Sequence, residues 1–420
     1  MEAPREDWHQ GEVVHRSRGG ASPLSDAAVP LAVAAFNLPT RFEYGPGVGE
    51  RAGELVAGLG AKRVLVVTDK GVVGAGVLDT IRKSFEVSGL KVEVYDEIVP
   101  NPRDTSVTEG ARILKSAACD GVVGLGGGSS MDAAKAIRAM AYAPGRINDY
   151  EGFFKFGGLR PPIPLVEIPT TSGTGSEADA WAVITDTHRC YKMGMGDPAL
   201  APDVALVDPK LTLDLPPLVT AGTGMDALCH ALEVYVARGA TPVTDALAIY
   251  AVELAARHLG PAVADGHDLE ARAGMSLASM IAGMAMSNCD CGIIHSMAES
   301  VGSLYDVPHG LAIGAFLPIG AEYNLASRPA KFARLAEALG RDVRGKHGLE
   351  AAREVIAALR GLRRNLGVPT PRELGLNPGD FEKLATFSVQ NMSTPGNPRA
   401  IDETGFVALF KRAYEEHDCS

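Results

Sequence analysis

The chain has 420 residues, of which 46% are hydrophobic and 22% charged, and its formal net charge is −11. This length exceeds one typical hydrophobic core and predicts two domains. The negative charge argues against nucleic acid and anionic membrane surfaces as partners, because both recruit basic patches. The apolar runs are too short to span a bilayer.

Residues 1–33 are polar and then rich in Ala and Pro, and they predict a flexible extension without the apolar core of a secretory signal. Six cysteines in so long a chain do not indicate a disulfide framework. Cys289 and Cys291 form a lone C-x-C pair, which we interpret as small buried hydrophobes rather than a thiolate site. We therefore expect a cytoplasmic protein.

Residues 34–215 alternate between strand and helix patterns. The segment 63–69, RVLVVTD, is a run of β-branched residues typical of a strand buried on both faces. A helix is predicted over about 104–118. Further strands are predicted over 91–98, at the start of 121–130, at the start of 164–177 and over 204–209. Strands separated by helices indicate an α/β domain with a wound parallel sheet.

Residues 216–420 have a different character, because strand patterns fade and Ala-, Leu- and Met-rich helical stretches replace them. We predict helices over 219–237, 242–258, 267–303, 328–340, 347–365, 379–389 and 402–416. The third of these is expected to stop at the turn Pro308-His309-Gly310. The sequence thus predicts an all-α second domain that begins near residue 215.

A glycine-rich loop joins one predicted strand to the next helix in the stretch GLGGGSSMDAAKAI. Gly126, Gly127, Gly128 and Ser129 exceed what a tight turn needs, and glycines let the backbone approach a phosphate at a helix N-terminus. The loop lacks the order G-x-G-x-x-G and follows the third predicted strand, so it is not the Rossmann fingerprint. Asp132 either contacts the cofactor or is a first-turn residue stabilised by the helix dipole.

Two further features complete the predicted dinucleotide cleft. Thr170, Thr171 and Thr174 offer hydroxyl groups in the second polar loop, PTTSGTGSEA. Asp69 ends the first predicted strand, where a carboxylate accepts hydrogen bonds from ribose hydroxyls, or alternatively caps the loop before Lys70. In the first case we expect NAD(H) to be preferred over NADP(H), whose 2′-phosphate the carboxylate repels.

Three histidines and one aspartate form a candidate metal site. Asp226 and His230 lie at positions i and i+4 of one predicted helix, so they share a face. By itself this spacing is more often a surface pair or a cap. His295 and His309 add two imidazoles, and such an oxygen and nitrogen set suits Fe(II), Zn(II), Co(II) or Mn(II) rather than Ca(II).

The chain resembles the iron-containing (group III) alcohol dehydrogenases over about residues 36–415. The resemblance rests on several segments that occur in one order. They are GGGSSMDAAKAI, PTTSGTGSE, PDVALVDP, GTGMDALCHALE, HSMAESVGSLYDVPHG and NPR at 397–399.

This resemblance implies a dinucleotide domain, a helical domain and a divalent metal, usually Fe(II) and alternatively Zn(II), in the cleft between them. It implies that Asp226, His230, His295 and His309 bind the metal. It also implies that Gly126 to Ser129 hold the NAD(P) pyrophosphate, and that Asp69, Thr170, Thr171, Thr174 and Lys192 lie along the cofactor. The expected activity is hydride transfer between NAD(P)(H) and a small alcohol or aldehyde (EC 1.1.1.-), in a homodimer or larger homo-oligomer.

One position departs from the family pattern. Many members read H-A-M-A-H, whereas this chain carries Glu299 at the second histidine position. A proton-relay role therefore cannot be transferred unchanged, and we predict that Glu299 supports catalysis by hydrogen bonding or proton delivery. The alternative is a solvent-facing helix residue. Arg399 and Arg189 could receive an anionic substrate group, but each is more often an ion-pair partner.

Three other interpretations stay open at this level. A glycerol-1-phosphate dehydrogenase or a dehydroquinate synthase-like enzyme would also join NAD to a metal, although the Asp226-x-x-x-His230 pair and the P-H-G turn favour alcohol dehydrogenases. A hydrolase would leave the glycine loops without a function. A metal-free NAD-binding or structural protein is the non-enzyme alternative.

Overall fold

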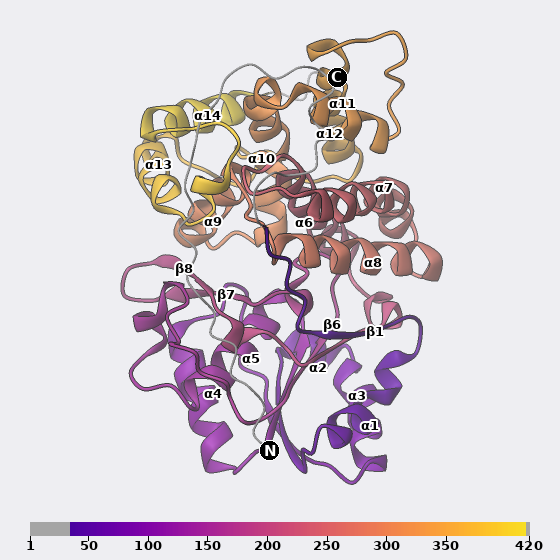
Figure 1. Cartoon of the computed structure of the whole chain (residues 1–420), viewed down its shortest axis with the longest axis vertical. Helices are drawn as coiled ribbons and strands as arrows, with labels where there is room; N and C mark the ends of the chain where they lie inside the picture. Colours follow the sequence, from indigo (N-terminus) through magenta and orange to yellow (C-terminus); the bar gives the residue numbers. More distant parts are fainter. Residues whose placement is uncertain (1–33, 417–420) are drawn as a thin grey trace.

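The computed structural model describes residues 34–416, and the predicted extension over residues 1–33 lies outside them. A parallel sheet with its helices forms the N-terminal half, and a stack of helices forms the C-terminal half above it (Figure 1). The predicted fold class is therefore confirmed. The predicted boundary near residue 215 falls in the connection between the last strand and the first long helix.

The main sheet has six parallel strands in the order β1-β9-β6-β4-β2-β3. These strands are β1 (Arg41–Tyr44), β2 (Arg63–Val67), β3 (Lys91–Tyr95), β4 (Gly121–Gly126), β6 (Leu165–Pro169) and β9 (Val204–Val207). The helices of this half are α1 (Ala52–Gly58), α2 (Lys70–Gly74), α3 (Val77–Val87), α4 (Asp104–Ser116) and α5 (Gly128–Met140). Strands β4 and β6 are buried along their whole length, as expected for a sheet covered on both faces.

The strand order reverses between β2 and β4. From β2 the chain moves outward to β3, and it then crosses back to place β4 on the other side of β2. In open parallel sheets, ligands bind beyond the carboxyl ends of the strands at such a reversal. The fold therefore brings the end of β2 and the end of β4, where Asp69 and the glycine loop lie, to one crevice.

Two parts of this half were not predicted. Strand β1 alternates polar and apolar residues at the sheet edge, and its existence makes the glycine loop follow the fourth strand rather than the third. A smaller sheet contains β5 (Gly152–Phe153), β7 (Trp181–Asp186) and β8 (Tyr191–Gly196), with β7 and β8 antiparallel. Gly194 and Gly196 interrupt the apolar pattern of β8, which explains why no strand was predicted there.

The C-terminal half consists of helices. They are α6 (Pro217–Val236), α7 (Pro242–Ala264), α8 (Leu269–Met286), α9 (Ile293–Tyr305), α10 (His309–Asn324), α11 (Pro329–Ala338), α12 (Leu349–Asn365), α13 (Phe381–Gln390) and α14 (Glu403–Glu415). The single helix predicted over 267–303 is wrong, because residues 287–292 separate α8 from α9. Helix α10 was missed, and the predicted turn at Pro308-His309-Gly310 is instead its beginning.

Close packing explains both errors. A Cβ atom on Gly292 would lie 2.8 Å from the carboxylate of Glu233 on α6, so the chain breaks where it meets that helix. A Cβ atom on Gly310 would lie 2.4 Å from the carbonyl oxygen of Gly222, so α10 begins in direct backbone contact with α6. Helix α10 is buried on nearly every face and therefore lacks the amphipathic period that reveals a surface helix.

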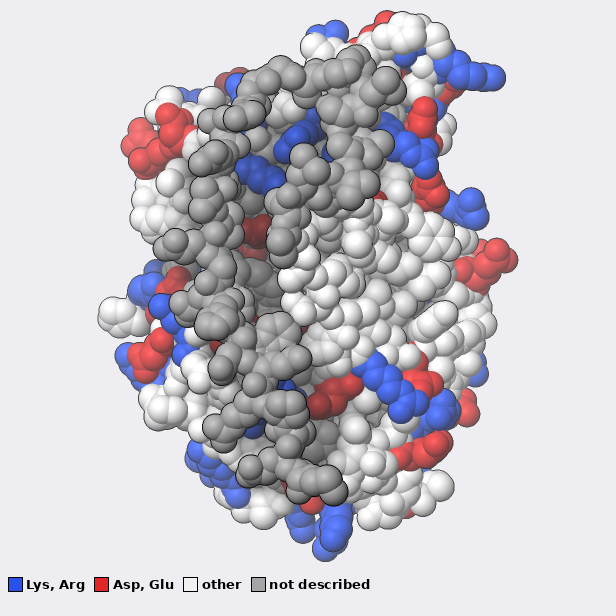
Figure 2. All heavy atoms as spheres, in the orientation of Figure 1, with Lys and Arg blue, Asp and Glu red and all other residues white. Residues whose placement is uncertain are grey.

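The described surface carries charges of both signs. Figure 2 shows Lys and Arg interspersed with Asp and Glu on one face of the molecule rather than gathered by sign. Within residues 34–416, none of the helices combines the length and the apolar character needed to cross a lipid bilayer.

An unpaired carboxyl group lies inside the main sheet. Glu167, in the middle of β6, is fully buried, and neither of its side-chain oxygens has a hydrogen-bond partner among the described residues. Gly124 on β4 makes room for it, because a Cβ atom there would lie 2.0 Å from Oε2 of Glu167. Burial raises the pKa of Glu167 well above its ordinary value of 4.5, so the folded chain keeps this carboxyl group protonated.

We expect the stability of the Glu167→Gln variant to fall less steeply with rising pH than the stability of the wild type. Above pH 4.5 the unfolded chain releases the Glu167 proton while the folded chain retains it, so the native state binds more protons and stability falls as pH rises. One such group contributes a slope of about 1.4 kcal/mol per pH unit until the folded-state pKa is reached. Denaturant unfolding between pH 5 and pH 8 measures the difference.

The exposed Glu86→Gln provides the matched control and should leave the pH slope of stability unchanged. If stability falls equally with pH in the wild type and in Glu167→Gln, the pKa of Glu167 is the same in the folded and the unfolded chain, which would contradict the prediction.

Candidate metal centre and nucleotide cleft

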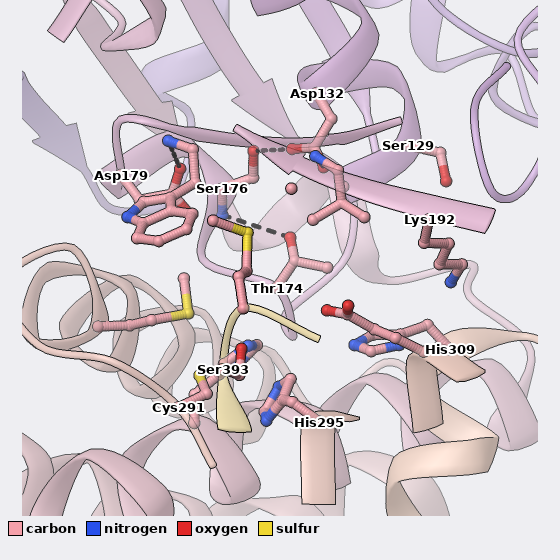
Figure 3. A pocket seen from close by; sticks show the side chains of 18 of the residues that line it. Ser129, Asp132, Thr174, Ser176, Asp179, Lys192, Cys291, His295, His309 and Ser393 are labelled. Atoms are coloured by element: carbon pink, nitrogen blue, oxygen red, sulfur yellow. Dashed lines mark hydrogen bonds between the residues drawn. The ribbon is translucent and has the colours of Figure 1, made fainter. Parts of the chain in front are cut away.

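A cavity of about 150 Å³ lies where the two halves of the chain meet. Ser129, Thr174 and Lys192 line it from the sheet side, and His295 and His309 line it from the helical side (Figure 3). Residues that are far apart in the sequence therefore share one small space.

The glycine loop ends β4 and begins α5 at the edge of this cavity. Gly126 has a φ of +153°, and a Cβ atom there would lie 2.6 Å from Oγ of Ser130. A Cβ atom on Gly128 would lie 2.5 Å from Cγ2 of Thr174. No side chain fits at these two glycines, and the first backbone N–H groups of a helix are where an anionic ligand is bound.

The second polar loop lies against the first. Thr171 lies beside Gly127, where a Cβ atom would be 3.3 Å from its Oγ1, and Thr174 lines the cavity next to Gly128. Thr170 is buried, and its backbone N–H donates to the carbonyl oxygen of Gly126 over 2.9 Å. The structure thus brings both predicted loops together, with Thr170 joining them through its backbone.

Asp69 lies beside the glycine loop at the strand reversal. Its Oδ1 accepts a hydrogen bond from the backbone N–H of Val72 over 3.0 Å, which caps the short helix α2. Its Oδ2 accepts from Oγ of Ser130, in the first turn of α5, over 3.2 Å. Asp69 therefore fulfils the capping alternative and also lies next to the predicted phosphate site.

Asp132 and Lys192 line the cavity, and the carboxylate of Asp132 has structural partners. The Asp132 carboxylate accepts from Oγ of Ser176 over 2.7 Å and from the backbone N–H of Val183 over 2.9 Å, so it ties α5 to β7. Lys192 on β8 is buried, and burial lowers the pKa of its ammonium group. Contact of either side chain with the cofactor stays a prediction.

The four candidate metal-binding residues converge. Asp226 and His230 lie one turn apart on α6, His295 lies on α9, and His309 is the first residue of α10. Oδ1 of Asp226 lies 3.8 Å from Nδ1 of His230, 3.6 Å from Nε2 of His295 and 3.5 Å from Nε2 of His309. Three imidazole nitrogens thus surround one carboxylate oxygen from three different helices.

The chemistry of these residues fits a divalent cation. Within the described chain, Oδ1 of Asp226, Nδ1 of His230 and Nε2 of His295 are buried without a hydrogen-bond partner. Burial alone would raise the pKa of Asp226, but the neighbouring imidazoles hold it well below its usual range. Burial lowers the pKa of His230 to about 4 and that of His309 to about 3. The pKa of His295 is instead raised well above its ordinary value, so its Nε2 must be free of a proton before it can bind a cation. An ionised carboxylate and neutral imidazoles are the forms that bind metals.

Glu233 supports this cluster and was not identified from the sequence. It is buried on α6, three residues after His230, and its Oε2 makes a 2.6 Å hydrogen bond with Nδ1 of His295. Its Oε1 accepts from the backbone N–H of Ile294 over 2.8 Å. Because a carboxylate accepts, Nδ1 of His295 carries the proton and Nε2 keeps a free lone pair toward Asp226. The available signal was a second acidic residue in an apolar helical run, seven positions after Asp226 and therefore on the same helix face.

We expect Glu233→Gln to weaken metal binding by about tenfold to a hundredfold. The backbone N–H of Ile294 and Nδ1–H of His295 both require an acceptor, and a glutamine amide offers only one oxygen. In the variant, the amide NH2 of glutamine therefore faces one of these two N–H groups. Because two donors repel each other, we expect the ring of His295 to turn away from Asp226. Competition with a chelator of known affinity measures the change. Unaltered metal affinity in a folded Glu233→Gln variant would refute this role.

The cysteines near the cluster are neutral. The Sγ atom of Cys291 and a ring nitrogen of each of His230 and His295 all lie within 4.8 Å of one another. Burial raises the pKa of the Cys291 thiol to about 12, and it raises the pKa of Cys229 well above the ordinary value. Cys289 is partly buried, and its pKa is raised to about 11 by the same cause. These thiols pack as small uncharged groups, in keeping with the sequence interpretation.

Known proteins match both halves of the chain. Residues 39–209 match the family described as "Iron-containing alcohol dehydrogenase", and residues 220–414 match "Fe-containing alcohol dehydrogenase family, C-terminal". The chain is 41% identical to a choline dehydrogenase of Bacillus subtilis (strain 168) over 90% of its own length and 94% of that protein. It is 40% identical to an NAD-dependent methanol dehydrogenase of Bacillus methanolicus over 90% of its length and 99% of that protein.

The fold has a close match among crystal structures. The structure of a 1,3-propanediol oxidoreductase superposes with a TM-score of 0.88 and 38% sequence identity, and the match covers 91% of this chain and all of the other. The shared length, the two matching family regions and the converging Asp and His residues lead to one conclusion. This chain is a member of the iron-containing alcohol dehydrogenase family.

Proposed function

We propose that this chain transfers a hydride between NAD(H) and a small alcohol or aldehyde at the cavity between its two halves. The observation that carries the proposal is the joining of a glycine-rich nucleotide loop and an Asp and His cluster in one cavity. The names of the similar proteins, which include choline, methanol and 1,3-propanediol dehydrogenases, support a small alcohol as substrate.

We assign the metal to Asp226, His230, His295 and His309, with Fe(II) as the expected ion and Zn(II) as the alternative. A bound ion of this kind supplies Lewis acidity toward an alcohol or carbonyl oxygen. Asp226 contributes the negative charge of the set, and the three histidines contribute imidazole nitrogens, of which those of His230 and His309 are kept neutral by burial. Glu233 holds the proton on Nδ1 of His295 and thereby fixes the direction of its Nε2.

We assign the cofactor to the other side of the cavity. Gly126, Gly127, Gly128 and Ser129 bind its pyrophosphate with the N-terminus of α5, and Asp69 contacts the adenosine ribose. Hydride transfer is the chemistry that a nicotinamide supplies. The chain contributes alignment and exclusion of water, since Lys192, His230 and His295 are all buried around the cavity.

Glu299 lies where a supporting role is feasible. It is partly buried on α9, one turn beyond His295, and lines the cavity. Its Oε2 accepts a hydrogen bond from Nδ2 of Asn391 over 2.5 Å. This placement favours a role at the site over the solvent-facing alternative.

A panel of small alcohols and aldehydes tests the proposed function. The protein is reloaded with Fe(II) or with Zn(II) and assayed with NAD+, NADH, NADP+ and NADPH. We expect metal-dependent oxidation or reduction, followed at the absorbance of the reduced nicotinamide. Protein that binds neither metal nor nucleotide would instead support the non-enzyme alternative.

We also propose a homodimer or larger homo-oligomer. Strand β1 lies at the edge of the main sheet, and its last residue Tyr44 is exposed, as are Phe36 and Leu38 shortly before it. An exposed edge strand with apolar neighbours favours pairing with a second copy. Light scattering of the purified chain should give at least twice the mass of 43.9 kDa.

A further inference from the structure

The cavity wall beside the histidines carries two acidic side chains that are not among the proposed metal ligands. Asp290 belongs to the connection over residues 287–292 between α8 and α9, and Glu299 lies on α9. Both side chains are partly buried and line the same cavity as His295. The break between α8 and α9 therefore presents an acidic residue to the substrate side of the site.

Each of these carboxylates has an oxygen available to a ligand. Oδ1 of Asp290 accepts from the backbone N–H of Cys291 over 2.8 Å, and Oε2 of Glu299 accepts from Asn391. Within residues 34–416, the second oxygen of each group accepts no hydrogen bond. Asp179, another acidic residue of the cavity wall, differs because its Oδ1 forms an ion pair with Nζ of Lys135 over 2.6 Å, which balances its charge.

One positive side chain faces this acidic wall. Lys192 is the one lysine or arginine that lines the cavity in the described part of the chain. Burial lowers the pKa of its ammonium group and the charge of Glu299 opposes that shift, but no ion pair within 4.0 Å joins the two side chains. Arg189, considered as a receptor for an anionic group, pairs with Asp186 and Glu151 instead. An anionic substrate would therefore meet carboxylates at this end of the cavity.

The second considered arginine is also engaged elsewhere. Arg399 lies over the ring of Tyr323, 4.1 Å from its centre, and donates to the Tyr323 carbonyl oxygen over 3.1 Å. It does not line the cavity. The arginine-based expectation of an anionic head group thus has no support in the structure.

The carboxylate of Asp290 is poorly solvated where it lies. Burial raises its pKa to about 7, and Glu233 and Glu299 add to the effect. A cation next to this group would replace the lost solvation of the charged form, whereas a methyl group would not. The environment of Asp290 therefore favours a positively charged neighbour over an apolar one.

We propose that the substrate is a small ammonium alcohol, whose positively charged nitrogen is held by the carboxylates of Asp290 and Glu299 while its hydroxyl group reaches the histidine cluster. This inference deepens the proposed function and rests on it, because it specifies which alcohols the site takes.

Two matched pairs of alcohols test the inference on the metal-loaded enzyme with NAD+. Choline and 3,3-dimethylbutan-1-ol have the same shape and differ in one charged atom, and 3-aminopropan-1-ol and butan-1-ol form the primary-ammonium pair. We expect kcat/KM to be at least about tenfold higher for the charged member of one pair. The pair that shows the preference distinguishes a quaternary from a primary ammonium group.

Variants locate the preference. Asp290→Asn and Glu299→Gln should each move the ratio of the charged to the neutral alcohol toward one. The exposed Glu350→Gln makes the same change in net charge far from the cavity, and it should keep the wild-type ratio. An equal loss for both members of a pair in Glu299→Gln would assign Glu299 to proton delivery and remove it from this inference.

A binding measurement on the wild type avoids any question of misfolded variants. Tetramethylammonium chloride should inhibit oxidation of the neutral alcohol competitively, while sodium chloride at equal ionic strength should not. Oxidation of neutral alcohols without preference for either ammonium alcohol, and without this inhibition, overturns the inference and leaves the proposed function intact. Absence of turnover with every alcohol and aldehyde tested overturns both.

Discussion

His309→Ala should lower turnover by at least about a thousandfold and remove most of the bound metal, while NADH still binds. Nε2 of His309 lies 3.5 Å from the carboxylate of Asp226, at the beginning of α10. Its loss leaves three of the four proposed ligands and opens the cluster toward the cavity. The glycine loop lies on β4 and α5 and does not depend on α10, so nucleotide binding should persist.

Metal analysis, steady-state rates and the fluorescence of bound NADH give the three readouts. His347 is exposed and distant from the cavity, and His347→Ala controls for the loss of an imidazole elsewhere. Asp226→Asn should give the same result, because it keeps the shape of the residue but removes the negative charge of the set. Full metal content together with the wild-type rate in His309→Ala would refute the assignment.

Asp69→Gly should raise kcat/KM for NADPH and lower it for NADH, and the wild type should prefer NADH by about a hundredfold. The carboxylate lies at the reversal point of the sheet, bound to Ser130 at the start of the predicted phosphate site. A 2′-phosphate would meet this negative charge. Lys70, the adjacent cation, pairs with Glu97 over 2.8 Å and offers little compensation.

The Asp69→Gly substitution also removes a helix cap and therefore lowers the stability of the fold slightly. Asp69 caps α2, and replacing an N-terminal cap by glycine costs only a few tenths of a kcal/mol, so the variant should fold. Asp69→Asn separates the two effects, because it keeps an acceptor for the ribose hydroxyl and removes the charge. A wild type that uses both cofactors equally well would show that Asp69 does not face the ribose.

Much of the sheet domain follows from local sequence. The β-branched runs of β2, β4 and β9 are visible because a strand buried on both faces must be apolar throughout. The glycine loop is visible because only bare backbone fits between β4 and Thr174. Edge strand β1 and the hairpin of β7 and β8 escaped detection, since β1 is short, β8 contains glycines, and strand preference depends strongly on neighbouring strands.

The site shows the same division more sharply. The sequence by itself determined that Asp226 and His230 share a helix face, because helical period fixes neighbours within one element. Only the tertiary structure decided that His295 and His309 meet them, that Glu233 fixes the ring of His295, and that Asp290 reaches the cavity. These contacts depend on how α6, α9 and α10 pack, and backbone approaches at Gly292 and Gly310 set that packing. The number of residues between two helices does not determine how far apart they lie in space. That distance follows from how closely the helices pack against each other.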